Sequence, residues 1–180
     1  EEVERTVCDV FAASAAVGWP QTVVCLYAPD YVPSATRLST TQRMWTVLAR
    51  ALPSSEVRVP LAEAPFTDPE GVGAFFDGNK GRLSPHKAVL EFKKDFLTSM
   101  VTVLRAVERH KPSVLIGDGQ GALVVMGLTR PVLLETALAA RNVQREDART
   151  LASAWAAVKV AIATRPHQGR AKLDLELIKR

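Results

Sequence analysis

Five consecutive residues form the segment of this chain whose types and spacing best suit chemistry: Gly117-Asp118-Gly119-Gln120-Gly121. A short apolar run at residues 113–116 precedes them, and the apolar run ALVVMGL follows. Glycine tolerates positive φ and close approach of other backbone, and it weakens a regular strand or helix. Three glycines at alternate positions therefore predict a tight turn from a strand into a helix.

Three interpretations of this turn remain open. In a nucleophile elbow, whose pattern is Gly-x-Ser-x-Gly, Gly119 would stand where the serine belongs. In an anion site, the backbone N–H groups that open the helix would hold a phosphate. The segment lacks both the spacing of dinucleotide-binding glycines and a Gly-Lys-Ser/Thr sequence, and Asp118 would repel phosphate. In the third interpretation, the glycines only let the strand turn and the helix pack closely on it.

Two carboxylates follow predicted strands. Asp30 comes after the first strand and Asp118 after a later one, so a parallel sheet would bring both to its carboxyl edge, where α/β folds bind ligands. Asp118 is expected either to bind a ligand there or to cap the following helix. A pair of carboxylates also suits acid–base chemistry or a divalent ion, but the sequence shows no third ligand. The candidate ligand-binding residues are Asp30, Gly117, Asp118, Gly119, Gln120 and Gly121, with no catalytic residue, metal ligand or cofactor assigned.

Hydrophobic periodicity predicts the elements that position the turn. Helices are expected at residues 3–16, 41–52, 85–110, 129–143 and 145–163, and strands at residues 22–29, 56–61 and 113–116. Buried strands that alternate with helices imply parallel pairing through right-handed crossovers. We therefore predict a three-layer α/β fold with a small, mostly parallel sheet, helices on both faces and extra C-terminal helices. One or two more edge strands are expected within 64–78 or 171–178.

The segment at residues 62–84 is too long for a routine connection. It contains two prolines, four glycines and three phenylalanines. It is expected to be either a functional loop or lid, or an excursion that its phenylalanines attach to the body of the fold.

Composition favours one globular domain. The chain has 180 residues, of which 47% are hydrophobic and 23% charged, and a net charge of +4. These values exclude wholesale disorder, and we expect a single domain at residues 1–165 followed by a basic tail at 166–180. No window has the roughly 20 apolar residues needed to cross a bilayer, so no membrane partner is expected. The chain begins with Glu1 rather than Met, as expected of a trimmed, processed or partial chain.

Cysteine and histidine are too sparse to suggest a disulfide scaffold or a metal site. Cys8 and Cys25 both lie in apolar segments and are expected to be buried, reduced thiols of an intracellular, cytoplasmic protein. His86, His110 and His167 have no Cys or His neighbour at the spacing of metal ligands.

Residues 20–128 resemble the central part of the α/β-hydrolase superfamily. The segments TVVCLYAPD, TQRMWTVLARALP and EVRVPLAE resemble a strand, a helix and a strand of that fold, and FLTSMVTVLRAVERHKPSVLIGDGQGALVVMGL resembles the part that carries the elbow. The resemblance implies a Ser, Cys or Asp at the elbow tip, and Gly119 has no side chain to act as nucleophile. It also implies an acid and a histidine on strands after the elbow, but the region after residue 128 is predicted to be helical, and His167 is the only later histidine.

The resemblance therefore implies a relative that has lost its nucleophile. We expect a non-catalytic interaction or scaffolding module of a larger protein or assembly, with a protein partner or a second copy of itself. The alternative is a small-molecule enzyme or phosphate binder that uses the turn at 117–121 and the strand-end carboxylates. Nucleic-acid binding through the basic tail at 166–180 is a third possibility.

Overall fold

The structure is a computed structural model that describes residues 2–13, 18–30, 37–67, 72–76, 85–140 and 143–165. The predicted basic tail at 166–180, with its possible strand at 171–178 and His167, lies outside these residues. The functional statements about that tail stay predictions.

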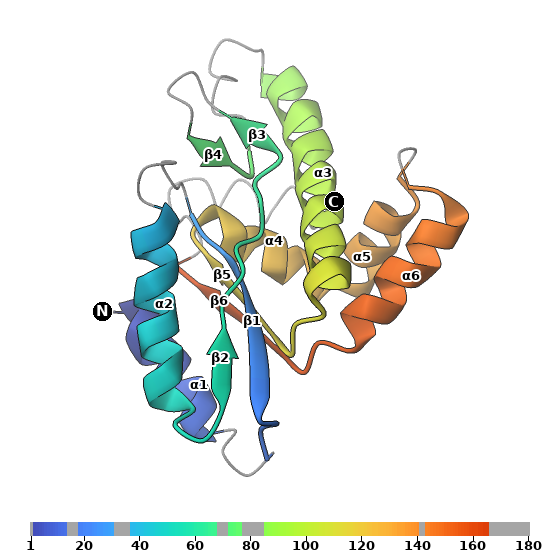
Figure 1. Cartoon of the computed structure of the whole chain (residues 1–180). Helices are drawn as coiled ribbons and strands as arrows, with labels where there is room; N and C mark the ends of the chain where they lie inside the picture. Colours follow the sequence, from blue (N-terminus) through green and yellow to red (C-terminus); the bar gives the residue numbers. More distant parts are fainter. Residues whose placement is uncertain are drawn as a thin grey trace.

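A four-stranded parallel sheet forms the middle layer of the fold (Figure 1). Its order is β2-β1-β5-β6, and every neighbouring pair is parallel. The strands are β1 (Thr22–Ala28), β2 (Glu56–Arg58), β5 (Val114–Asp118) and β6 (Val160–Thr164). Every residue of β5 is buried, as expected of a central strand covered on both faces. The predicted parallel sheet is confirmed.

Helices cover both faces of the sheet (Figure 1). One layer consists of α1 (Glu2–Ala13) and α2 (Arg37–Ala51); the other contains α3 (Pro85–His110), α4 (Gln120–Leu128), α5 (Pro131–Leu138) and α6 (Arg145–Ala156). Val23, Cys25 and Tyr27 of β1 join the core beneath the first layer, whereas Leu26 and Ala28 join the core beneath the second. Among the described residues no single helix is long and apolar enough to cross a membrane; α4 and α5 together meet that test but bend by 95° where they meet.

The chain reverses its direction of travel across the sheet between β1 and β5. It passes from β1 through α2 to the outer strand β2, and α3 then carries it back past β1 to β5. The carboxyl ends of β1 and β5 therefore flank the point at which ligands bind in open α/β sheets. Asp30 and the turn at 117–121 both lie there.

The predicted helix at residues 145–163 is wrong at its end. Helix α6 ends at Ala156, and Val160–Thr164 is strand β6, paired with β5. The apolar spacing that suggested a helix through Ile162 also suits a β-branched strand, and pairing with β5 decides between them. A smaller difference concerns α2, which begins at Arg37 rather than at residue 41.

In its described residues, 59–67 and 72–76, the segment after β2 adds no edge strand to the main sheet, although 64–78 was one of the two places where such a strand was expected. It forms a separate antiparallel pair, β3 (Phe66–Thr67) with β4 (Gly73–Ala74). Phe75 and Phe76 follow β4 and are buried in the core beside α3. The Phe76 ring stacks on Phe92 of α3 at a centroid distance of 4.9 Å. This packing favours a segment attached by its phenylalanines.

The two cysteines differ. Cys25 is buried in β1, as expected, but Cys8 on α1 is exposed, so the expectation of two buried thiols is wrong for Cys8. Burial raises the pKa of the Cys25 thiol to about 12. Cys25 is therefore a core residue, whereas Cys8 lies on the surface.

Candidate functional site

The glycine-rich turn joins β5 to α4, where the sequence predicted it. Gly119 lies at its tip with φ 55° and ψ −113°, a conformation that L side chains rarely adopt. Its N–H donates to the carbonyl of Thr164, 3.1 Å away, which ties the tip to the end of β6. The backbone at this position favours glycine, because a residue with a side chain would be strained there before any side-chain contact is considered.

Asp30 fills the space next to the tip. A Cβ atom added to Gly119 would overlap the carboxyl group of Asp30. Asp30 Oδ1 also accepts the backbone N–H of Gln120, the first residue of α4, at 3.0 Å. A negative group at a helix N-terminus satisfies a free N–H and lies at the positive end of the helix dipole. Asp30 therefore caps α4, and a side chain at the tip would require its carboxyl group to move.

Asp118 has a different partner. It does not cap α4; its side chain, 6% exposed, lies against Arg165, the residue after β6. Arg165 Nε donates to Oδ1 at 3.0 Å and Nη2 donates to Oδ2, while the Thr164 hydroxyl lies 3.2 Å from Oδ1. This two-point contact is the strong geometry of an arginine–carboxylate pair. The hydrogen bond to Asp118 raises the pKa of the Arg165 guanidinium.

Tyr27 completes a charged cluster at this edge of the sheet. Its side chain is 5% exposed, and burial is the main cause that raises the pKa of its phenol. The negative charges of Asp118 and Asp30 raise that pKa further, whereas Arg165 and Arg43 act in the opposite direction. The edge therefore combines carboxylates and guanidinium groups around a buried phenol.

Gln120 holds the segment that follows β4 over the turn. Its side-chain Oε1 accepts the backbone N–H groups of Phe75 and Phe76 at 2.9 and 3.3 Å. The buried hydroxyl of Ser99, on α3, donates to the carbonyl of Phe75. The predicted ligand-binding side chain of Gln120 is thus engaged in fixing the fold.

The other two glycines of the motif also serve packing. Gly117 is buried in β5, and its carbonyl accepts the Thr164 hydroxyl at 3.2 Å. Gly121 lies in the first turn of α4, where a Cβ atom would collide with the backbone carbonyl of Ala28. A larger residue there would push α4 away from β1.

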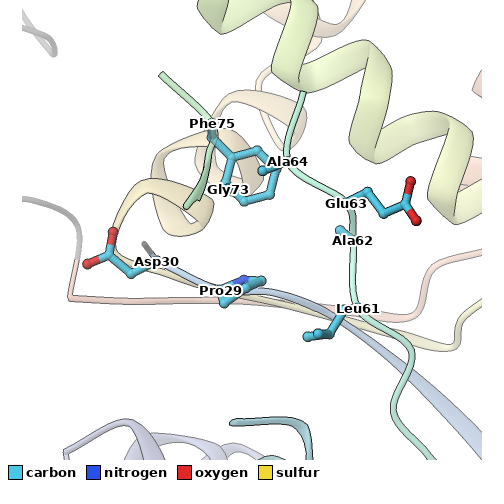
Figure 2. A pocket seen from close by; sticks show the side chains of 8 residues that line it. All are labelled: Pro29, Asp30, Leu61, Ala62, Glu63, Ala64, Gly73 and Phe75. Atoms are coloured by element: carbon cyan, nitrogen blue, oxygen red, sulfur yellow. The ribbon is translucent and has the colours of Figure 1, made fainter. Parts of the chain in front are cut away.

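A small pocket lies next to Asp30, with a volume of about 30 Å³. It is lined by Pro29, Asp30, Leu61, Ala62, Glu63, Ala64, Gly73 and Phe75. Figure 2 shows Asp30 and Glu63 on opposite sides of this pocket, with their carboxylates pointing away from each other. The volume is enough for a water molecule, and ligand pockets are usually about ten times larger or more. The two carboxylates do not form an acid–base pair across it.

All six candidate residues lie at the turn. Their contacts with other parts of the fold hold the turn in place. Within the described parts of the chain, no three His, Cys, Asp or Glu side chains gather in a way that could hold a metal ion. Sequence reasoning missed Thr164 and Arg165, because the strand that ends in Thr164 was assigned to a helix. It also missed Tyr27, which it placed correctly in a strand but took only as part of an apolar run. Recognising Val160–Thr164 as a parallel strand would have placed Arg165 at the carboxyl edge.

No family model, curated protein or solved structure matches this chain. The geometry of the site is therefore the basis for assigning a function.

Proposed function

We propose that this chain is a non-catalytic, α/β-hydrolase-like interaction or scaffolding module of a larger protein or assembly. One observation carries the proposal: the Asp30 carboxylate occupies the volume that a side chain on Gly119 would need. An elbow nucleophile acts through a side chain exposed at the tip of the strand-to-helix turn. Here the tip is glycine, and a carboxylate that caps α4 lies on it.

Further features support the hydrolase-like part of the proposal. The turn follows a central parallel strand, opens a helix and has positive φ at its tip, as a sharp elbow requires. Strand β6 follows the elbow in the chain, in the region where the family carries its acid and histidine. The residues at its end are Thr164 and Arg165, neither of which replaces a catalytic acid.

The alternative, a phosphate binder or small-molecule enzyme, fits the site less well. A phosphate at the N-terminus of α4 would compete with the carboxylate of Asp30, which already binds the first N–H group there. Asp118 is in turn neutralised by Arg165. Both strand-end carboxylates are therefore committed to contacts within the fold.

Two assays test the proposal. Purified chain is expected to hydrolyse p-nitrophenyl acyl esters no faster than buffer does. In a thermal-shift screen with nucleotides, phosphosugars, acyl esters and divalent ions, no compound is expected to raise the melting temperature. A ligand at 100 times its Kd would add about 2.7 kcal/mol to the free energy of unfolding.

Asp118→Asn and Asp30→Asn show whether any hydrolysis or melting-temperature shift arises at the site. Asp147→Asn, at the exposed start of α6, is the matched control. Hydrolysis above the buffer rate, or a ligand shift that vanishes in Asp30→Asn or Asp118→Asn but persists in Asp147→Asn, would favour the enzyme or phosphate-binding alternative.

A further inference from the structure

Strand β2 forms one edge of the main sheet, with β1 on its inner side and no partner strand on its outer side among the described residues. The N–H of Glu56 donates to the carbonyl of Gln21 at 2.6 Å, and the carbonyl of Pro60 accepts the N–H of Tyr27 at 2.9 Å. Backbone groups alternate in direction along a strand. The N–H and C=O groups of Val57 and Val59 therefore face outward, along the free edge.

An exposed tryptophan lies beside this edge. Trp45 of α2 is 45% exposed, and its indole N–H donates to the outward carbonyl of Val57 at 3.0 Å. A groove of about 320 Å³ runs along the edge, lined by Thr41, Gln42, Trp45, Val57, Arg58 and Val59. Of the large apolar side chains that are exposed in the described chain, Trp45 alone lines this edge groove. Tryptophan, like tyrosine and arginine, is enriched among the residues that contribute most to binding at protein interfaces.

We propose that a second copy of this chain pairs with β2 in antiparallel orientation, across a two-fold axis at Val57. In such a pair, Val57 and the partner's Val57 face each other and exchange both N–H···O bonds. Strand β2 consists of an acidic, an apolar and a basic residue in that order. With the axis at Val57, Glu56 therefore lies opposite the partner's Arg58, and Arg58 lies opposite the partner's Glu56. Opposite charges directly across an antiparallel pair are stabilising. The edge is complementary to itself.

This charge complementarity selects a second copy as the occupant. Within the monomer, Arg58 Nε lies 2.9 Å from Glu56 Oε1 in an exposed ion pair, so both charged groups lie at the surface and would exchange or share this contact on pairing. A two-fold axis perpendicular to the sheet keeps α2 of both copies on the same face, so Trp45 approaches the partner's Trp45 near the axis. The Val57 carbonyl has two lone pairs and can accept both the indole and the partner's N–H.

The inference deepens the proposed interaction role by naming its surface and its partner. Sedimentation velocity of the 180-residue chain tests it. The mass is expected to rise with concentration to twice 19.6 kDa. Glu56→Arg and Arg58→Glu each place like charges opposite one another, so each variant alone is expected to dimerise about tenfold more weakly or worse. An equimolar mixture of these two variants restores both opposite-charge contacts, and is expected to recover the doubled mass.

Glu135 is an exposed residue of α5, in the opposite layer of the fold. Glu135→Arg makes the same charge change as Glu56→Arg away from β2, and this variant is expected to dimerise like the wild type. Circular dichroism confirms that each variant is folded. A wild-type chain that stays monomeric up to about 1 mM would overturn the inference. So would single variants that dimerise like the wild type, or a mixture that stays monomeric. These outcomes do not depend on the ester and thermal-shift assays. A result against pairing through β2 can therefore be told apart from a result against the non-catalytic role.

Discussion

The carboxyl group of Asp30, at the end of the first strand, lies in the volume that a side chain on Gly119 would occupy. The same carboxylate accepts the N–H that opens α4. This relationship explains why glycine stands at the tip of the turn and how the first helical N–H is satisfied. It also explains why the tip offers no reactive side chain.

Substitution at the tip is expected to be costly. Gly119→Ala should lower the free energy of unfolding by roughly 2–4 kcal/mol, because the backbone strain of positive φ adds to the overlap with Asp30. Gly18→Ala is the matched control, since Gly18 also has positive φ (+65°) but open space around its Cβ position. It should lose only about 1–2 kcal/mol. Urea unfolding of both variants measures the difference, and equal losses would show that Asp30 leaves room for a side chain.

Removing Arg165 should leave a buried carboxylate without its ionic partner. Arg165→Met is expected to cost about 1–2 kcal/mol, less than a fully buried pair because the Arg165 side chain is about half exposed. Arg165→Lys should fall between this variant and the wild type, since lysine keeps the charge but not the two-point contact. Arg43→Met, which breaks an exposed pair with Glu4, should cost less than about 1 kcal/mol. A loss at Arg165 no larger than at Arg43 would argue against the pairing with Asp118.

The side chain of Gln120 should control how firmly the segment after β4 is held. Gln120→Ala removes the acceptor of two backbone N–H groups, so amide hydrogen exchange at Phe75 and Phe76 should speed up. Gln120→Glu keeps acceptor oxygens in place and should preserve most of the protection. Exchange followed by NMR measures both amides. Protection that survives Gln120→Ala would mean that burial of the two phenylalanines holds the segment without this side chain.

The two thiols should react very differently. At pH 8 an aromatic disulfide reagent should label exposed Cys8 and spare buried Cys25, whose pKa is raised to about 12. Urea should release the second thiol, and Cys8→Ser should abolish labelling of the folded chain. Because the folded pKa lies above the ordinary value of 9.0, the neutral thiol's contribution to stability is complete below pH 9 and is lost as the pH rises towards 12. Rapid labelling of Cys25 in the native chain would contradict its burial.

Short sequence patterns predicted the strands and turns that depend mainly on neighbouring residues. The apolar run at 22–28 and the glycines at 117–121 mark a buried strand and a tight turn, because these residue types suit few other structures. Strand β6 was missed because its spacing also suits a helix, and only its pairing with β5 favours a strand. The contacts of Asp30 with Gly119 and of Asp118 with Arg165 join distant parts of the chain. Periodicity and motif spacing carry no information on such pairs.

Whether the Asp30 carboxyl group fills the space at the tip is tested by a double-mutant cycle at Asp30 and Gly119. Free energies of unfolding are measured for the wild type, Gly119→Ala, Asp30→Ala and the double variant, with Gly18→Ala in both backgrounds as the control for additivity. If the carboxyl group fills the space at the tip, Gly119→Ala should cost about 1–2 kcal/mol less in the Asp30→Ala background, while Gly18→Ala costs the same in both. An equal cost of Gly119→Ala in both backgrounds would contradict the claim that Asp30 occupies the place of the nucleophile.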